Sequence, residues 1–236
     1  MSGTASRRIL RNLVHHVRRL RGHAEMRVGR ISSLTPLSAA YGYDRGTPID
    51  RAYIEAFLAD HAADIRGRVL EIGDDTYSRR FGGPAVARQD VLHIHPGNPA
   101  ATIVGDLASP QTLPSDAFDC IILTQTLQYV FDLQAAVQQI HRALRPGGVA
   151  LITVPAISPI CGDEWRDSHY WLFTARAVER LLSGSFDVDK VNVSSFGNLY
   201  AATAFLHGAA VEEVSRRKLV PVNPEYAITI VARAVA

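Results

Sequence analysis

The sequence predicts an α/β fold with a doubly wound, mostly parallel β-sheet. From residue 68 onward, short apolar segments alternate with stretches of helical periodicity, and the apolar segments are hydrophobic at nearly every position. Such strands are buried on both faces, which is typical of a parallel sheet covered by helices. The expected strands are 68–73, 85–90, 101–106, 118–124, 149–154, 188–194 and 226–234. The expected helices are 49–63, 133–144, 174–182 and 199–214, with Thr47 capping the first.

Composition limits the classes of protein that the chain can represent. Its 236 residues are 47% hydrophobic and 20% charged, which indicates one core-bearing domain with or without a small appendage. The longest near-apolar run, 201–211, is about half as long as a membrane span requires, so we expect no transmembrane segment. Two cysteines, Cys120 and Cys161, give neither a disulfide framework nor a paired zinc motif. We therefore expect a cytoplasmic protein without a structural metal.

Positive charge is concentrated at the start of the chain. Residues 1–30 contain eight Arg and one Glu, a net charge of +7, whereas the rest has 17 basic and 22 acidic residues, a net charge of −5. The apolar residues between Ile9 and Leu20 follow a helical period. We therefore divide the chain into a basic helix with a lid or linker, residues 1–47, and a sheet domain, residues 48–236. The helix could dock on its own domain or form a homo-oligomer, with a membrane surface or an acidic partner as the alternative. The acidic body disfavours nucleic acid as a partner.

Acidic residues recur near the expected strand ends. Ligands of a doubly wound sheet bind outside the carboxyl ends of its strands. Glu71 and Gly73 lie at the end of the first strand, and Asp90, expected to end the second, follows Gly73 by 17 positions, which suits a carboxylate on ribose hydroxyls. The third strand ends at Gly105-Asp106-Leu107, where Asp106 could accept from an adenine amino group and Leu107 could pack on the ring. Each acid could instead be a helix cap.

The residues over about 67–155 resemble the class I S-adenosylmethionine-dependent methyltransferases. The matching segments are Val69-Leu70-Glu71-Ile72-Gly73, Asp90, Gly105-Asp106-Leu107, 118–130 and the turn Leu144-Arg145-Pro146-Gly147-Gly148. The resemblance implies a seven-stranded Rossmann-like sheet with an antiparallel last strand, and S-adenosylmethionine as cofactor. It implies these cofactor-binding residues: Glu71, Gly73, Asp74, Asp90, Asp106, Leu107 and Thr124.

One loop departs from the family's pattern. The family's first loop is usually Gly-x-Gly-x-Gly, whereas only Gly73 remains here, followed by Asp74-Asp75-Thr76. A carboxylate of Glu71, Asp74 or Asp75 could instead meet the methionine ammonium of the cofactor. The missing glycines leave open an alternative, a catalytically inactive methyltransferase-like protein that binds a partner through its basic helix. An NAD-dependent oxidoreductase is disfavoured by the 144–148 turn and by the incomplete dinucleotide fingerprint.

Two further segments, 43–51 and 170–174, resemble a subgroup associated with saccharide and natural-product pathways. The resemblance implies methyl transfer to a hydroxyl of a saccharide or a glycosylated natural product, with N- and C-methylation open. An acceptor hydroxyl needs positioning and a base. His169 is the candidate catalytic base, because it titrates near neutrality in a loop with both tryptophans. The alternative is a histidine that only packs there.

Candidate acceptor-binding residues come from three segments. The lid and the loops after the fourth and fifth strands supply Tyr43, Arg45, Gln125, Gln128, Trp165, Tyr170 and Trp171. Some of these could equally be turn or helix-surface residues. The pair His93 and His95 lacks a nearby third ligand, so we expect no metal at that pair.

Overall fold

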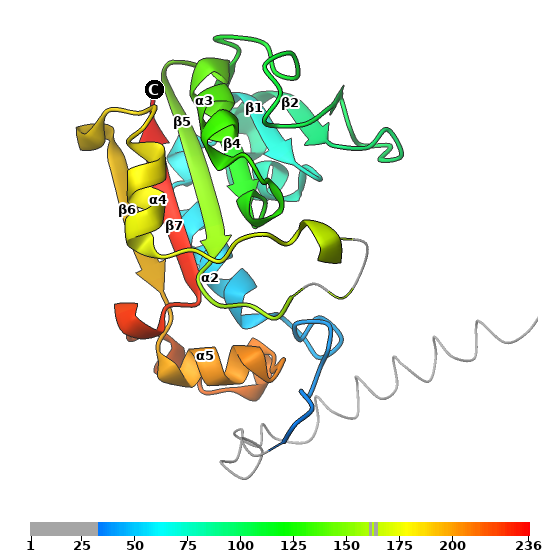
Figure 1. The fold of residues 1–236 in the computed structure, drawn as a ribbon, viewed down its shortest axis with the longest axis vertical. Helices are drawn as coiled ribbons and strands as arrows, with labels where there is room; N and C mark the ends of the chain where they lie inside the picture. The colour runs from blue at the N-terminus through cyan, green and yellow to red at the C-terminus, as the bar shows by residue number, and fades with distance from the viewer. Residues whose placement is uncertain (1–32, 161, 163–164) are drawn as a thin grey trace, which may run out of the picture.

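Seven strands form one sheet in the order β3-β2-β1-β4-β5-β7-β6 (Figure 1). The structure, a computed structural model, describes residues 33–160, 162 and 165–236. The strands are β1 Gly67–Ile72, β2 Val86–His93, β3 Ile103–Val104, β4 Phe118–Thr124, β5 Leu144–Pro155, β6 Val191–Phe196 and β7 Thr229–Val235. Strands β1 to β5 pair in parallel, whereas β7 runs antiparallel to both of its neighbours. This confirms the doubly wound, Rossmann-like, mostly parallel sheet with an antiparallel last strand.

Helices cover both faces of the sheet. They are α2 Ile49–Asp60, α3 Leu133–Ala143, α4 Ala175–Leu182, α5 Leu199–Leu206 and α6 Arg216–Leu219. Helices α3 and α4 lie on one face, and α2 lies on the other (Figure 1). Along β4, Ile121 and Leu123 pack in the core with α3 and α4, while Cys120 and Ile122 pack with α2. Since successive side chains of a strand point to opposite faces, this burial explains why the strands are apolar throughout.

Several element boundaries differ from the sequence-based expectation. Strand β2 extends to His93 rather than ending at 90, and β5 begins at Leu144, so the Arg145–Gly148 turn lies within its bounds. The expected helix 199–214 ends at Leu206, because Gly208 turns the chain with a φ of +68°. Thr47 does not cap α2, whose cap position is Pro48. The Thr47 side chain donates a hydrogen bond to Glu212 instead.

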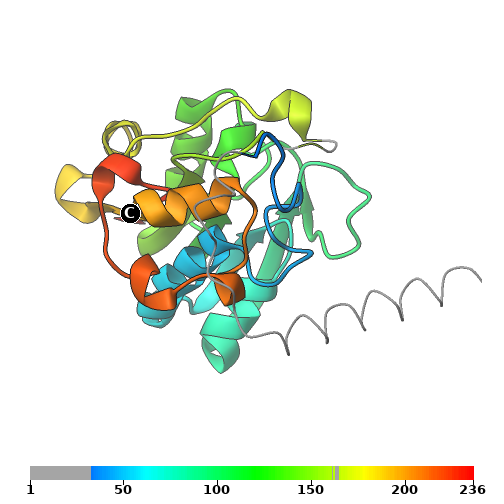
Figure 2. The same ribbon diagram turned by 90° about the horizontal axis from the view of Figure 1, so that it is seen from below.

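Three segments lie over the carboxyl ends of the parallel strands. They are residues 33–47, which we call the lid, the described residues 156–160, 162 and 165–172 of the segment after β5, and helix α5 (Figure 2). The Arg45 guanidinium forms a two-pronged ion pair with Glu213, with Nε 2.8 Å from Oε2. Thr47 donates from its backbone N and its Oγ1 to the Glu212 carboxylate, each at 2.9 Å. The lid is thus fastened to residues that follow α5. The basic helix expected before the lid, and any oligomer contact through it, lie outside the described residues.

Gly208 sets how closely the lid can pack. A Cβ at this position would lie 2.3 Å from the backbone oxygen of Ser38 in the lid. We expect Gly208→Ala to lower the unfolding temperature and to increase proteolysis within residues 33–47, because the lid must move away. Gly147→Ala is the matched control: its φ is also positive, +79°, but no atom lies within 4 Å of the added Cβ. Both variants carry a backbone penalty of about 1 kcal/mol. Equal lid proteolysis in the two variants would contradict the proposed clash.

Candidate functional site

The tips of β1, β2 and β3 lie side by side at the carboxyl edge of the sheet. The backbone N of Gly73 donates to Leu92 O at 2.9 Å, and that of Gly105 donates to His93 O at 3.1 Å. Asp106 follows Gly105, and its carboxylate is exposed, with Oδ1 accepting from the backbone of Ala108 at 2.9 Å. The strand tips that the sequence predicted to lie together are therefore adjacent, although the residue at the tip of β2 differs from the expected one.

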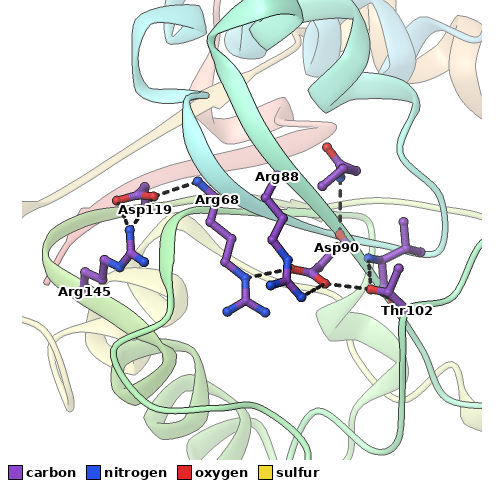
Figure 3. A network of polar contacts seen from close by, with 8 residues as sticks. Arg68, Arg88, Asp90, Thr102, Asp119 and Arg145 are labelled. Carbon is purple, nitrogen blue, oxygen red and sulfur yellow. Dashed lines mark hydrogen bonds and ion pairs between the residues drawn. The ribbon is translucent and has the colours of Figure 1, made fainter.

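The prediction that Asp90 ends the second strand is wrong. Strand β2 continues for three residues to His93, and Asp90 lies inside the strand opposite Leu70 of β1. Its side chain is only 4% exposed, because Arg68 Nε lies 2.7 Å from Oδ2 and Thr102 Oγ1 donates to Oδ1 at 3.0 Å (Figure 3). Arg88 adds a longer contact at 3.3 Å. The position that a ribose-binding acid would take at the strand tip is occupied by His93.

The Asp90 contacts belong to a polar network that extends to the amino ends of β1, β4 and β5 (Figure 3). Although burial alone would raise the pKa of Asp90, the hydrogen bonds from Arg68 and Thr102 hold it below its usual value. The backbone N of Arg68 donates to Asp119 Oδ2 at 2.7 Å, and Arg145 binds the same carboxylate at 2.8 Å. The network therefore links β2 to β1, and β1 to β4 and β5. Asp90 stabilises the sheet from within.

Glu71 organises the loop that follows β1. Its buried carboxylate accepts from the backbone N of Tyr77 at 3.1 Å and from the N and Oγ of Ser78 at 2.8 and 2.7 Å. Burial raises the pKa of Glu71, and the hydrogen bonds from Ser78 and Tyr77 oppose that rise. Its carboxylate thus holds the glycine-poor loop in place through three donors of the chain itself.

The same loop leaves its first residues accessible. Gly73 has a φ of +91°, and a Cβ there would meet no atom within 4 Å, so a ligand can approach this backbone closely. The side chain of Asp74 is exposed, whereas that of Asp75 is ion-paired to Arg79 at 2.5 Å. Of the two aspartates after Gly73, Asp74 is therefore the more available to a ligand.

The end of β4 carries strained and buried polar groups. Gln125 follows Thr124, the last residue of β4, and has a φ of +49°, a conformation that residues other than glycine rarely adopt. Gln128 is 3% exposed and donates from Nε2 to Gln125 Oε1 at 3.3 Å. Within the described part of the chain, the buried Gln128 Oε1 accepts no hydrogen bond. A buried acceptor of this kind is typical of a group that meets a ligand or ordered water.

Histidine and aromatic rings from three loops meet near these tips. The Trp165 ring lies 6.2 Å from His93, 6.3 Å from His95 and 5.8 Å from Tyr129, measured between centroids. The Tyr129 ring lies 5.3 Å from that of His169. We call these five residues the ring cluster. Burial lowers the pKa of His169, which favours the neutral imidazole near pH 7. The participation of His93, His95 and Tyr129 was not foreseen, because nothing in the spacing relates them to Trp165.

The remaining predicted acceptor residues are dispersed. Arg45 is engaged by Glu213, and Tyr43 lies beside Arg51. Tyr170 is half-exposed, and its backbone N donates to Gln128 O at 2.9 Å. Trp171 packs against the main core, and its Nε1 donates to Val130 O at 3.0 Å. Of the two tryptophans, Trp165 therefore joins the ring cluster, while Trp171 anchors the loop.

The described residues contain neither a membrane-spanning helix nor a metal-binding cluster. Within residues 33–160, 162 and 165–236, no helix has the length and apolar composition to cross a membrane. In the same ranges, no group of three or more His, Cys, Asp or Glu side chains could hold a metal ion.

The strand order defines an α/β protein of the Rossmann-like type, a class of fold whose ligands generally bind at the carboxyl ends of the parallel strands. A sequence model of the family described as "Methyltransferase domain" matches residues 39–185, more than half of the chain. The chain belongs to this methyltransferase family.

Known proteins agree with this assignment. The chain is 26% identical over 176 residues to a Mycolicibacterium smegmatis protein described as a probable S-adenosylmethionine-dependent methyltransferase, covering 72% of this chain and 63% of that protein. It thus spans less than two thirds of this relative's length. A solved S-adenosylmethionine-dependent methyltransferase from Mesorhizobium loti is similar in fold, with a TM-score of 0.54 at 16% identity, over 80% of this chain and all of that one. One from Archaeoglobus fulgidus has a TM-score of 0.54 at 13% identity, over 79% and 94%.

These comparisons support S-adenosylmethionine as the cofactor, and the residues at the edge suit it. Gly73 offers accessible backbone, the Asp106 carboxylate is exposed, and Leu107 is buried beside it. The fold alone does not fix the reaction. The structure of the [4+2]-cyclase SpnF has the same fold, with a TM-score of 0.52 at 15% identity, over 86% of this chain and 88% of that one.

Proposed function

We propose that this chain transfers a methyl group from S-adenosylmethionine to a hydroxyl of a small molecule, a saccharide or a glycosylated natural product. The observation that carries the proposal is the position of the ring cluster at the cofactor edge. His93 belongs both to the tip of β2 and to the cluster, which continues through Trp165 and Tyr129 to His169. Cofactor edge and acceptor surface are therefore contiguous.

On the cofactor side, we assign contacts to five residues at the strand ends. They are Gly73, Asp74, Asp106, Leu107 and Thr124. His93 takes the place at the ribose that Asp90 was expected to fill, since an imidazole nitrogen can exchange a hydrogen bond with a hydroxyl. Glu71 contributes by holding the first loop in its folded form.

On the acceptor side, we assign the substrate contacts to aromatic rings and to one side-chain amide. Aromatic faces suit the apolar side of a sugar ring or an aglycone, which favours Trp165 together with the half-exposed Tyr43 and Tyr170. The Gln128 amide, assisted by Gln125, orients the acceptor hydroxyl.

The cofactor supplies the methyl group as an electrophile when it is bound. The chain positions the acceptor oxygen, excludes water and accepts the hydroxyl proton at the His169 imidazole. A lowered pKa keeps that imidazole able to accept a proton at neutral pH.

The test has two stages. Calorimetry with S-adenosylhomocysteine measures cofactor binding, and mass spectrometry after incubation with S-adenosylmethionine measures the gain of one CH₂ on saccharides, phenols and amines. We expect binding, and methylation of a saccharide hydroxyl. No heat at millimolar S-adenosylhomocysteine would overturn the enzyme and favour the alternative, an inactive methyltransferase-like binding protein. Methylation only of amines would overturn the choice of oxygen.

A further inference from the structure

Arg51, in the first turn of α2, is held by two tyrosines. Its Nε donates to Tyr43 OH at 2.5 Å, and a terminal nitrogen donates to Tyr77 OH at 2.9 Å. The guanidinium carbon lies 5.9 Å from each tyrosine ring centroid. Among the described residues, no carboxylate lies within ion-pair distance of Arg51. By contrast, the similarly buried Arg45 and Arg68 each pair with an acid. Arg51 is therefore a positioned, partly buried cation that the charge of Asp50 influences but that has no directly paired carboxylate among the described residues. A ligand carboxylate would supply the direct partner.

Asp50, the residue before Arg51, carries a buried carboxylate oxygen that lacks a hydrogen-bond donor in the described part of the chain. Asp50 Oδ1 is buried, and within the described residues it accepts no hydrogen bond. Burial raises the pKa of the Asp50 carboxyl, and the charge of Arg51, together with hydrogen bonds from the backbone of residues 50 and 51, opposes that rise. The Asp50 charge also acts on the Tyr43 phenol, so the acid and the arginine share one neighbourhood. A ligand with a carboxylate and an ammonium on the same carbon, as in an α-amino acid, would satisfy both side chains.

The surrounding elements place this pair next to the cofactor edge. Tyr77 lies in the loop that begins at Gly73, Tyr43 lies in the lid, and Arg51 lies at the start of α2. The positive end of the α2 dipole favours a carboxylate there. Asp106, assigned to the adenine, follows β3, which lies on the far side of β2 from β1. A cofactor that extends from the β3 tip past the β1 tip therefore presents its other end toward this loop.

We propose that Arg51 and Asp50 bind the α-amino-acid head of the cofactor, Arg51 through the carboxylate and Asp50 through the ammonium. The proposal rests on the cofactor site of the proposed function. It also relates the altered first loop to cofactor binding, because Tyr77, which follows the Asp74-Asp75-Thr76 segment, holds Arg51 in position.

Two ligands distinguish binding of the amino-acid head from binding of the adenosine part of the cofactor. S-adenosylhomocysteine carries the amino-acid head, whereas 5′-methylthioadenosine keeps the adenosine and lacks the head. By calorimetry, we expect Arg51→Gln to weaken S-adenosylhomocysteine binding at least about tenfold, the effect of losing one charge-assisted interaction, with 5′-methylthioadenosine unchanged. Asp50→Asn should show the same selectivity. The matched control is Arg79→Gln, an exposed arginine of the same loop paired to Asp75, which should leave both affinities unchanged.

The outcomes distinguish a failure of the Arg51 and Asp50 assignment from a failure of the proposed function. If wild-type protein binds neither ligand, the proposed function fails. If it binds both and Arg51→Gln weakens both equally, or neither, then Arg51 is structural and the inference is overturned. If Asp74→Asn rather than Asp50→Asn selectively weakens S-adenosylhomocysteine, the assignment of Asp50 is overturned. Should Arg51→Gln fail to fold, Tyr43→Phe serves instead, since this half-exposed hydroxyl positions Arg51. An unchanged S-adenosylhomocysteine affinity in that variant would also contradict the proposal.

Discussion

Replacing Asp90 with alanine is expected to lower the free energy of unfolding by roughly 3 kcal/mol. The side chain is 4% exposed and is held by Arg68, Arg88 and Thr102, so its removal leaves the partly buried Arg68 without its anion. Urea unfolding followed by circular dichroism measures the change. The control is Arg88→Ala, which removes the 63% exposed partner and should cost less than about 1 kcal/mol.

The pH dependence of the Asp90→Ala difference is a second readout. The folded-state pKa of Asp90 is lowered, so its contribution is fully present above the ordinary aspartate pKa of about 4 and is lost as the pH falls through the folded value. Wild type and variant should therefore converge in stability in acid. A variant as stable as wild type at pH 7, with a weakened affinity for S-adenosylhomocysteine, would instead restore Asp90 as a cofactor residue.

Replacing His169 with asparagine is expected to lower kcat by about 10²- to 10⁴-fold, the usual contribution of a positioned general base. Because burial lowers the pKa of His169, wild-type kcat should rise with pH along an acidic limb below about pH 6.5 and then level off. In His169→Asn the limb should disappear. Rates with the acceptor found by mass spectrometry give both quantities.

A control separates this role from general damage. His141 of α3 packs on Phe186, away from the ring cluster, and His141→Asn should retain both kcat and the acidic limb. S-adenosylhomocysteine affinity should stay unchanged in both variants. Persistence of the acidic limb in His169→Asn would assign the base to another group.

The sheet was predictable because its signals are local. Apolar runs separated by stretches of helical periodicity predicted all seven strands, because a strand that is buried on both faces is hydrophobic at nearly every position. The end of β2 was placed too early because Asp90 follows Gly73 by 17 positions, a spacing that suits a ribose-binding carboxylate at a strand end. What keeps Asp90 inside the sheet is Arg68, which is 22 positions earlier in the chain, and no spacing rule reveals that pairing.

The site was predictable only in outline. That ligands meet the carboxyl edge follows from topology, and Gly73 and Asp106 lie there as expected. The ring cluster joins His93 to Trp165, and Arg45 is bound by Glu213, 168 positions away. Contacts between loops distant in sequence depend on how the folded chain packs, so residue type alone favoured Arg45 as an acceptor ligand.

The fastening of the lid also bears on synthesis. Thr47 and Glu212 are 165 positions apart, and β7, which follows β6 in the chain, inserts between β5 and β6. Such long-range closure comes late in folding, because much of the chain must be ordered first. During synthesis, a nascent chain that has not yet reached Glu212 therefore cannot fasten its lid, and a product that stops before β7 lacks the strand that joins β6 to the rest of the sheet.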